Sequence, residues 1–235
     1  MIKLERTDVM NFENAIRGMR NPMNSWDKSD SGVCDGDYSM EYCVKCPFQN
    51  DDRCYDVGDG EFIIGSNDLS LAKRLCKAGS DHRKFLRQIF VSVDITAPLY
   101  FWKEYDTYKV GTTANSTSTM HKIHAKEFTS DDFSWEYINF DNGGSSSTDV
   151  LFHLIIKELN SLREEYNKNK DKDVWYSMIQ LLPSSYNQMR TCTMTYENLR
   201  NMYHARKNHK LDEWHTFCEW VETLPYAKEL IVGEI

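Results

Sequence analysis

The segment 198–217, NLRNMYHARKNHKLDEWHTF, places an arginine where a helix is expected to be apolar. Leu199, Met202 and Tyr203 have the i, i+3, i+4 spacing of a buried helical face, and Arg206 takes the i+7 position of that face. Because a buried, unpaired guanidinium is costly, Arg206 should meet a fixed anion. That anion could be a protein carboxylate, or a phosphate or carbonyl oxygen of a ligand.

A second group of reactive residues lies in the segment 21–61, which is rich in Asp, Gly, Ser and Asn and has no hydrophobic period. It holds four of the seven cysteines: Cys34, Cys43, Cys46 and Cys54. The central C-x2-C pair lets two thiolates reach one ion, and the outer two could complete a tetrahedral zinc site. A zinc ion would order a segment that lacks a core. The outer spacings match no standard zinc pattern, so free thiols or a redox or iron–sulfur role are alternatives.

Two further segments have residue types that suit an anion. In the sequence KAGSDHRKFLRQ, residues 77–88, a predicted helix end is followed by four basic side chains: His82, Arg83, Lys84 and Arg87. They could bind phosphate or form a solvated basic face. In GTTANSTSTMHK, residues 111–122, Ser116 and Ser118 and the backbone N–H groups of a small polar loop could hold a phosphate. No order of Ser, His and Asp indicates a hydrolase.

The composition limits the class of protein. The chain has 235 residues and a formal net charge of −8, and 40% of its residues are hydrophobic. This length allows a sizeable core. The acidic balance argues against a general nucleic-acid-binding protein, because phosphate contacts along a nucleic acid need a basic face. A local pocket with one or two arginines can still bind a small anion.

The N-terminal residues MIKLERTDVMNF contain no apolar signal-peptide region, and no stretch approaches the roughly 18 apolar residues of a membrane span. We therefore expect neither a signal peptide nor a membrane-spanning segment. Seven cysteines without a secretory signal favour the reducing cytoplasm.

Regular elements must position these residues. The patterns predict a short strand at 2–6, a helix at 11–20, a helix at 66–79 that ends at Gly79, and a half-buried strand in RQIFVSVDI, residues 87–95. The buried face of the first helix is predicted to consist of Phe12, Ala15, Ile16 and Met19. A further helix should begin at Pro98 and run to about Tyr108, and residues 111–122 read as a loop.

The second half is predicted to be helical. A long amphipathic helix should cover 149–168, and its inward face is predicted to contain Leu151, Leu154, Ile155, Leu159 and Leu162. Another helix should cover 173–181 and end before Pro183, and a pair of helices follows it. We expect an α+β fold that is rich in helix, formed as a single domain over residues 1–235 with an irregular insertion at about 21–61.

Several of these motifs occur in an order that resembles the flavin-dependent thymidylate synthases. The matching pieces are Ala97-Pro98, the loop 115–121, Leu182-Pro183 with Tyr186, and then Asn201, Arg206, His209 and Trp214. The resemblance covers most of residues 62–222 and leaves the cysteine-rich insertion outside. It implies a small antiparallel sheet packed with long helices, in a homotetramer whose active sites lie between subunits. It also implies FAD as cofactor, and transfer of a one-carbon unit from methylenetetrahydrofolate to C5 of dUMP.

The resemblance assigns roles by position. The residues that it places near the nucleotide are Arg206, Ser116, Ser118, Glu104, Lys109 and Tyr186. The residues that it places near the flavin are Asn201, His209, His82, Arg83, Arg87 and Asn115. It assigns no nucleophilic side chain, and Ser118 and Cys192 are better interpreted as binding or packing residues.

This chain differs from the family pattern at three cationic motifs. Thr107-Tyr108-Lys109 replaces an Arg-His-Arg signature, the loop loses its arginine at Met120-His121, and Thr195-Tyr196-Glu197 replaces an Asn-x-Arg motif. The candidates to replace these cations are Arg83, Lys84, Arg87 and Lys109. The altered site could methylate the nucleotide or hydroxymethylate it. Alternatively, the chain could be a non-catalytic nucleotide- or partner-binding module whose insertion is held by zinc.

Overall fold

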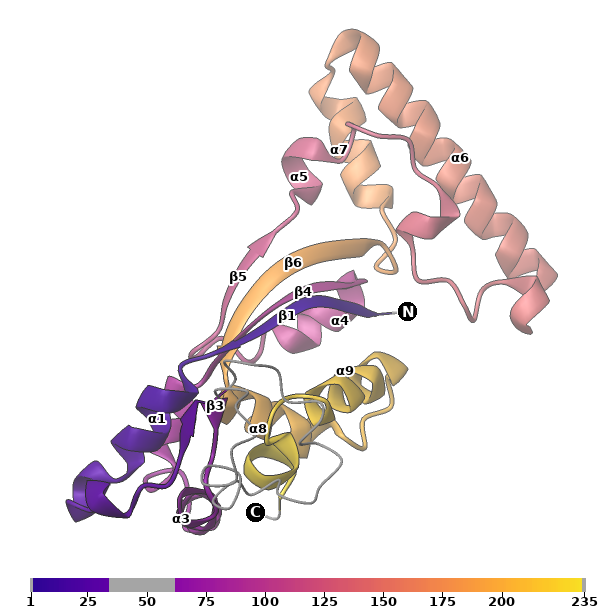
Figure 1. Ribbon diagram of the computed structural model, residues 1–235. Helices are drawn as coiled ribbons and strands as arrows, with labels where there is room; N and C mark the ends of the chain where they lie inside the picture. The colour runs from indigo at the N-terminus through magenta and orange to yellow at the C-terminus, as the bar shows by residue number, and fades with distance from the viewer. Residues whose placement is uncertain (1, 34–61, 234–235) are drawn as a thin grey trace. The chain divides into compact units, whose positions relative to one another are not determined.

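The computed structural model describes residues 2–33 and 62–233 (Figure 1). Its main sheet has the strand order β1-β4-β6-β5. These strands are β1 (Lys3–Met10), β4 (Phe90–Pro98), β5 (Thr113–Ser116) and β6 (Asn187–Thr195). A second, antiparallel pair consists of β2 (Gly32–Val33) and β3 (Phe62–Ile63), in which Gly32 lies opposite Ile63. The predicted α+β class, rich in helix and with a small antiparallel sheet, is confirmed.

The longer helices are α1 (Phe12–Met19), α3 (Ser66–Lys77), α4 (Leu99–Tyr105), α6 (Ser146–Asn169), α7 (Lys172–Leu181), α8 (Tyr196–Arg206) and α9 (Asp212–Glu222). Short 3-10 turns include η4 (Lys84–Gln88), and a five-residue π-helical turn, η7 (Lys228–Val232), lies near the C-terminus.

The chain forms two compact units. Unit 1 comprises Met1–Arg6, Val93–Lys109 and Thr113–Cys192, and unit 2 comprises the described residues of Thr7–Ser92, Val110–Thr112 and Thr193–Ile235. The division falls within the strands β1, β4 and β6. The single domain expected from the sequence stays a prediction.

In unit 1, α6 and α7 lie side by side as a hairpin (Figure 1). The buried core that they share contains Ile123, Phe128, Phe133, Phe152, Leu159 and Met178. Phe152 and Leu159 are seven residues apart and therefore lie on one face of α6. Leu151 and Leu154 were predicted to face inward, but they are 56% and 54% exposed. That prediction was wrong because α7 covers only the stripe around Phe152 and Leu159.

The segment 111–122 was predicted to be a loop, which is partly wrong. Residues Thr113–Ser116 form the edge strand β5, and Thr119–Lys122 form the short helix α5. Ala114 and Asn115 have weak strand propensity, but pairing with β6 supplies hydrogen-bond partners for the backbone of β5.

In unit 2, the predicted face of α1 is confirmed, since Phe12, Ala15, Ile16 and Met19 are all buried. The carboxylate of Asp30 accepts hydrogen bonds from the N–H groups of Asn67 and Asp68 and so caps α3 from a distant part of the chain. Gly79, with φ of +106°, follows α3 as predicted.

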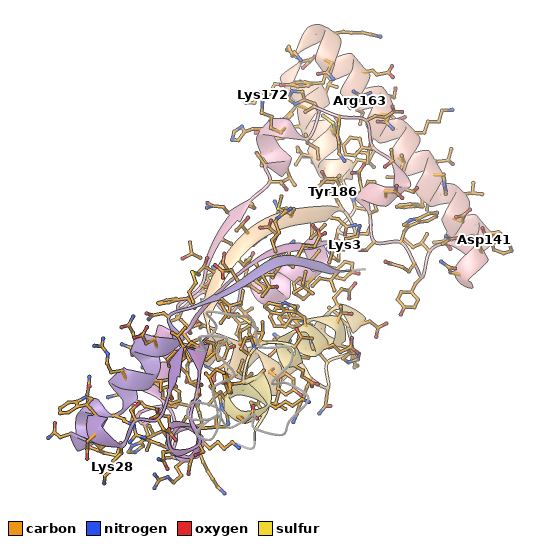
Figure 2. All side chains as sticks on the ribbon, viewed as in Figure 1. Lys3, Lys28, Asp141, Arg163, Lys172 and Tyr186 are labelled. Carbon is orange, nitrogen blue, oxygen red and sulfur yellow. The ribbon has the colours of Figure 1, made fainter. Side chains whose placement is uncertain are left out.

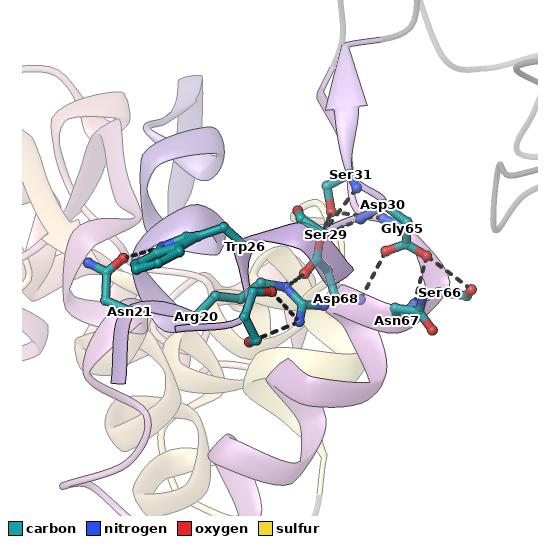
Figure 3. Close-up of polar contacts among 11 residues, drawn as sticks. Arg20, Asn21, Trp26, Ser29, Asp30, Ser31, Gly65, Ser66, Asn67 and Asp68 are labelled. Atoms are coloured by element: carbon teal, nitrogen blue, oxygen red, sulfur yellow. Dashed lines mark hydrogen bonds and ion pairs between the residues drawn. The ribbon is translucent and has the colours of Figure 1, made fainter. Parts of the chain in front are cut away.

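Asp68 is fully buried and fastens the segment that follows α1 to α3 (Figure 3). Its carboxylate accepts hydrogen bonds from the guanidinium of Arg20 and from the hydroxyl groups of Ser29 and Ser31. Burial alone would raise the pKa of Asp68, but these hydrogen bonds and the charge of Arg20 outweigh it and lower that pKa. The ion pair is therefore a structural element of unit 2.

Candidate functional site

Arg206 is the last residue of α8 and is half-buried. Its guanidinium carbon lies 5.1 Å from the ring centroid of Trp214, which is fully buried on α9. Arg206 was predicted to lie in the buried stripe, and the structure corrects this because the helix ends at this residue. Leu199, Met202 and Tyr203 are buried as predicted.

The buried cation of α8 is Arg200, which is 1% exposed. Its Nη1 donates hydrogen bonds to the carbonyl oxygens of Leu230 (3.1 Å) and Ile231 (2.8 Å) in η7. The Nε2 of His204, one turn further along, is 3.0 Å from the carbonyl oxygen of Ile231. Burial lowers the pKa of both Arg200 and His204. Arg200 therefore joins the C-terminal turn to α8.

Sequence reasoning missed Arg200, although a signal was present. Arg200 lies four residues after Tyr196 and three before Tyr203, and both tyrosines are buried. Residues at these spacings share a helical face. The polar partners that make burial possible are backbone carbonyl groups from η7, and no side-chain pattern reveals them.

Two of the four basic side chains in the segment 82–87, those of Arg83 and Arg87, form hydrogen bonds with other groups of the protein. The Nε of Arg83 donates to Oε2 of Glu197 on α8 at 2.8 Å, and both side chains are nearly buried. Arg87 is exposed, and its Nη2 donates to the carbonyl oxygen of Ser80 at 3.2 Å. His82 and Lys84 are exposed. The expectation that these cations replace the missing arginines stays a prediction, and Arg83 is the least suitable because Glu197 already neutralises it.

Asn201 and His209 present polar groups at the surface of unit 2. Asn201 is exposed on α8. His209 is half-buried in the turn after α8, and its Nδ1 accepts a hydrogen bond from the backbone N–H of Leu211 at 3.2 Å. Since Nδ1 accepts, the ring proton is carried by Nε2, which is then a donor.

The serine-containing loop lies against β6 in unit 1. The backbone N–H of Thr117 donates to the carbonyl oxygen of Met189 at 2.9 Å, and Nε2 of Gln188 donates to the carbonyl oxygen of Thr117 at 2.9 Å. Asn115, Ser116 and Ser118 are all exposed. The hydroxyl oxygen of Ser118 accepts from the backbone N–H of His121 and caps α5. The loop is thus held by its backbone, and its polar side chains face outward.

The other residues predicted to contact the nucleotide also belong to unit 1. Glu104 is half-buried on α4, and Lys109 is exposed after that helix. Tyr186, labelled in Figure 2, is half-buried, and its ring lies 5.6 Å from that of Phe133 in an edge-to-face contact. Burial raises the pKa of Tyr186. Tyr186 packs with the aromatic core, and its binding role stays a prediction.

Sequence reasoning also missed Arg190 on β6. Its Nη1 forms an ion pair with Oδ1 of Asp106 at 2.7 Å, and its Nε donates to Oε1 of Gln188 at 2.9 Å. The guanidinium carbon lies 4.1 Å from the ring centroid of Trp102, which is buried on α4. A cation between Gln188 and Cys192 at alternating strand positions was the available signal.

The predicted metal ligands Cys34, Cys43, Cys46 and Cys54 lie outside the described residues, so the zinc site stays a prediction. Within residues 2–33 and 62–233, no group of three or more His, Cys, Asp or Glu side chains could hold a metal ion. Cys192 is buried, and burial raises its pKa to about 11. It is therefore a thiol at neutral pH, which suits the packing role expected for it. Among the described helices, none is long and apolar enough to cross a membrane.

Comparison with known proteins identifies the fold. ThyX, Thymidylate Synthase X, from Helicobacter pylori with FAD and dUMP matches at a TM-score of 0.64 and 14% identity, over 98% of this chain and 97% of that chain. A second Helicobacter pylori ThyX structure, complexed with FAD and dUMP, matches at a TM-score of 0.62 and 14% identity, over 97% of each chain.

The UMP/dUMP methylase PolB from Streptomyces cacaoi, bound with 5-Br dUMP, matches at a TM-score of 0.57 and 12% identity, over 99% of this chain and 95% of that chain. No protein-family model matches this chain, and no curated protein does. The chain therefore has the fold of the flavin-dependent thymidylate synthases, as the resemblance of its motifs predicted.

Proposed function

We propose that this chain is an FAD-dependent enzyme that transfers a one-carbon unit from methylenetetrahydrofolate to C5 of dUMP. The observation that carries the proposal is the shared fold along nearly the whole chain with structures that contain FAD and dUMP. The ordered motifs from Ala97-Pro98 to Trp214 support it independently. The proposal includes membership of the flavin-dependent thymidylate synthases, a homotetramer with shared active sites, and a cytoplasmic location.

Asn201 and His209 fit a role in holding the flavin. The amide of Asn201 is exposed, and the Nε2 proton of His209 is available because Nδ1 is the acceptor. A flavin ring offers carbonyl oxygens and ring nitrogens that accept such hydrogen bonds. His82, Arg87 and Asn115 are exposed and also suit this role, whereas Arg83 would have to share its guanidinium with Glu197.

The protein's part in the reaction is to bind and orient, and the bound reduced flavin would supply the hydride. Arg206, held over the ring of Trp214, would bind the nucleotide through charge-assisted hydrogen bonds. Ser116 and Ser118, on a loop held by its backbone, would donate hydrogen bonds to a nucleotide phosphate. The product would be a methylated nucleotide, or a hydroxymethylated one if water intercepts the one-carbon intermediate.

Flavin binding provides the first test. The purified chain should be yellow, or should change the visible absorbance of added FAD with saturation near one flavin per chain. A colourless protein that does not bind FAD, but that holds one zinc ion per chain by elemental analysis, would contradict the proposal and favour the zinc-held binding module.

Product analysis provides the second test. Incubation with dUMP, methylenetetrahydrofolate and a flavin reductant should give a product whose mass identifies a methyl or a hydroxymethyl group at C5. Arg206→Ala should weaken dUMP binding by roughly 10- to 100-fold with an unchanged circular dichroism spectrum. Unchanged dUMP affinity in this variant would refute the role of Arg206.

A further inference from the structure

Arg190 occupies a position on β6 where a cation is unusual. Residues 188, 190 and 192 alternate along the strand and therefore point to one face of the sheet. Gln188 is 7% exposed and Cys192 is fully buried, so this face belongs to the interior of unit 1. A charged group at such a position must have a specific set of partners.

The guanidinium of Arg190 is held rigidly. Its central carbon lies 4.1 Å from the ring centroid of Trp102, whose Nε1 donates at 3.0 Å to two carbonyl oxygens, those of Ala97 and Gln188. Nε of Arg190 donates to the side chain of Gln188, and Nη1 donates to Asp106. Arginine on an aromatic ring with two fixed hydrogen bonds loses little further freedom when it binds a ligand.

These contacts leave donors for a ligand. Of the five N–H donors of a guanidinium, one on Nε and one on Nη1 are used, and the described residues provide no hydrogen-bond acceptor for Nη2. The side chain of Arg190 is still 16% exposed, so the protein does not enclose it completely. Two N–H groups in a plane match two oxygens of a phosphate.

Gln188 joins Arg190 to the serine-containing loop. Its Oε1 accepts from Arg190, while its Nε2 donates to the carbonyl oxygen of Thr117. Thr117 is in turn bonded to Met189 through its backbone N–H. One buried amide side chain thus fixes the cation and the loop that carries Ser116 and Ser118 with respect to each other.

We propose that Arg190 binds the phosphate group of a nucleoside monophosphate, together with the hydroxyl groups of the loop 116–118. This inference rests on the proposed function and names the cation that serves the site in place of the arginines absent from the motifs. Asp106 is 48% exposed and balances the charge of Arg190 when no ligand is bound. A phosphate dianion would compete with Asp106 for the same guanidinium, so the carboxylate lowers the affinity of the site.

Because the phosphate and Asp106 compete, substitutions of Arg190 and Asp106 should change the dUMP affinity in opposite directions. Calorimetric titration of the full chain, with FAD added, would give the affinities of dUMP and deoxyuridine for four proteins: wild type, Arg190→Gln, Asp106→Asn and Arg6→Gln. Arg190→Gln should weaken dUMP binding by about 10- to 100-fold and leave deoxyuridine binding unchanged. Asp106→Asn should strengthen dUMP binding several-fold, because it removes the competing carboxylate.

Arg6→Gln is the matched control, since Arg6 pairs with Asp94 in the same unit and is largely exposed. It should change neither affinity. A merely structural ion pair predicts a different pattern, in which Arg190→Gln and Asp106→Asn both weaken dUMP and deoxyuridine binding to a similar extent. That pattern, or unchanged dUMP affinity in Arg190→Gln, would overturn the inference.

A titration with inorganic phosphate separates this inference from the proposed function. If the wild type does not bind dUMP but binds phosphate, and Arg190→Gln abolishes that binding, the anion site stands and the proposed function fails. If the wild type binds FAD and turns over dUMP while Arg190→Gln has wild-type affinities, the proposed function stands and the inference fails. Binding of neither dUMP nor phosphate overturns both.

Discussion

Arg190 and Arg200 lie on the interior faces of two consecutive elements, β6 and α8, yet their surroundings differ. Arg200 is 1% exposed and donates to two backbone carbonyl groups of η7. The side chain of Arg190 is 16% exposed, lies on Trp102, and pairs with Asp106, which is itself half-exposed. One cation is enclosed by its own unit, and the other is held in place with part of its side chain still exposed.

The difference indicates how to separate a structural cation from a binding one. The carbonyl groups of Leu230 and Ile231 accept hydrogen bonds from a guanidinium that is removed from solvent, and such an arrangement is stable only when every part is present. An aromatic ring and a solvated carboxylate orient Arg190 without enclosing it. We therefore expect substitutions of Arg200 to change stability and substitutions of Arg190 to change affinity.

The largest effect is expected for Arg200→Met. This variant leaves the carbonyl groups of Leu230 and Ile231 without these donors, and it should lower the free energy of unfolding by about 3 kcal/mol. Urea unfolding followed by circular dichroism measures the change. Arg206→Met is the control on the same helix and should cost less than about 1 kcal/mol, since Arg206 is half-buried. Equal losses in the two variants would contradict the structural role of Arg200.

The next largest loss of stability is expected for Asp68→Asn, which changes the buried carboxylate between α1 and α3 in unit 2. The neutral amide loses the ion pair with Arg20, and we expect a loss of about 2 kcal/mol at pH 7. Because the pKa of Asp68 in the folded state lies below 3.8, its stabilisation is complete well above pH 3.8 and is lost as pH falls below that value. Urea midpoints from pH 7 to pH 3 should fall less steeply for Asp68→Asn than for the wild type, and parallel curves would contradict this assignment.

A smaller change in stability is expected for Arg190→Met. Loss of the contact with Trp102 and of the half-exposed ion pair should lower the free energy of unfolding by about 1 kcal/mol or less. The same urea titration gives this value, to be compared with that of Arg200→Met. A loss as large as that of Arg200→Met would remove the distinction between the two arginines.

The smallest effect concerns His204, whose pKa is lowered by burial beside the carbonyl oxygen of Ile231. The folded protein favours the neutral ring, so the unfolded chain binds a proton more readily and stability should fall as pH decreases below 6.5. His204→Gln keeps a donor for Ile231 but cannot titrate. Its urea midpoint should therefore vary less between pH 8 and pH 5.5 than that of the wild type, and an unchanged dependence would contradict the role of His204.

Some elements could be predicted from the sequence because their patterns are local. The alternation of Ile89, Val91, Val93 and Ile95 predicted a strand, and all four residues are buried in or next to β4. The strand β6 was not predicted, since Thr191 and Thr193 alternate with Cys192 and Met194 without a strong contrast in hydrophobicity. Its pairing in the sheet determines that it forms a strand.

For the candidate site too, the sequence predicted some features and gave no information about others. The order of motifs predicted the fold, and it singled out exposed residues such as Asn201 and Ser116 whose roles remain predictions. It gave no information about the ion pair between Arg83 and Glu197, because the two are 114 residues apart in the chain. An ion pair between distant residues depends on packing that no local pattern encodes.

The sequence by itself therefore determined the class of fold and most of the helices, and it singled out Arg206 as a cation in line with an apolar helical face. Only the tertiary structure decided that Arg200 is enclosed and that Arg190 stays partly exposed. Periodicity reports which face of an element a residue occupies, but the partners that compensate a buried charge come from other parts of the chain. Leu230 and Ile231 provide them for Arg200, and Trp102, Asp106 and Gln188 provide them for Arg190.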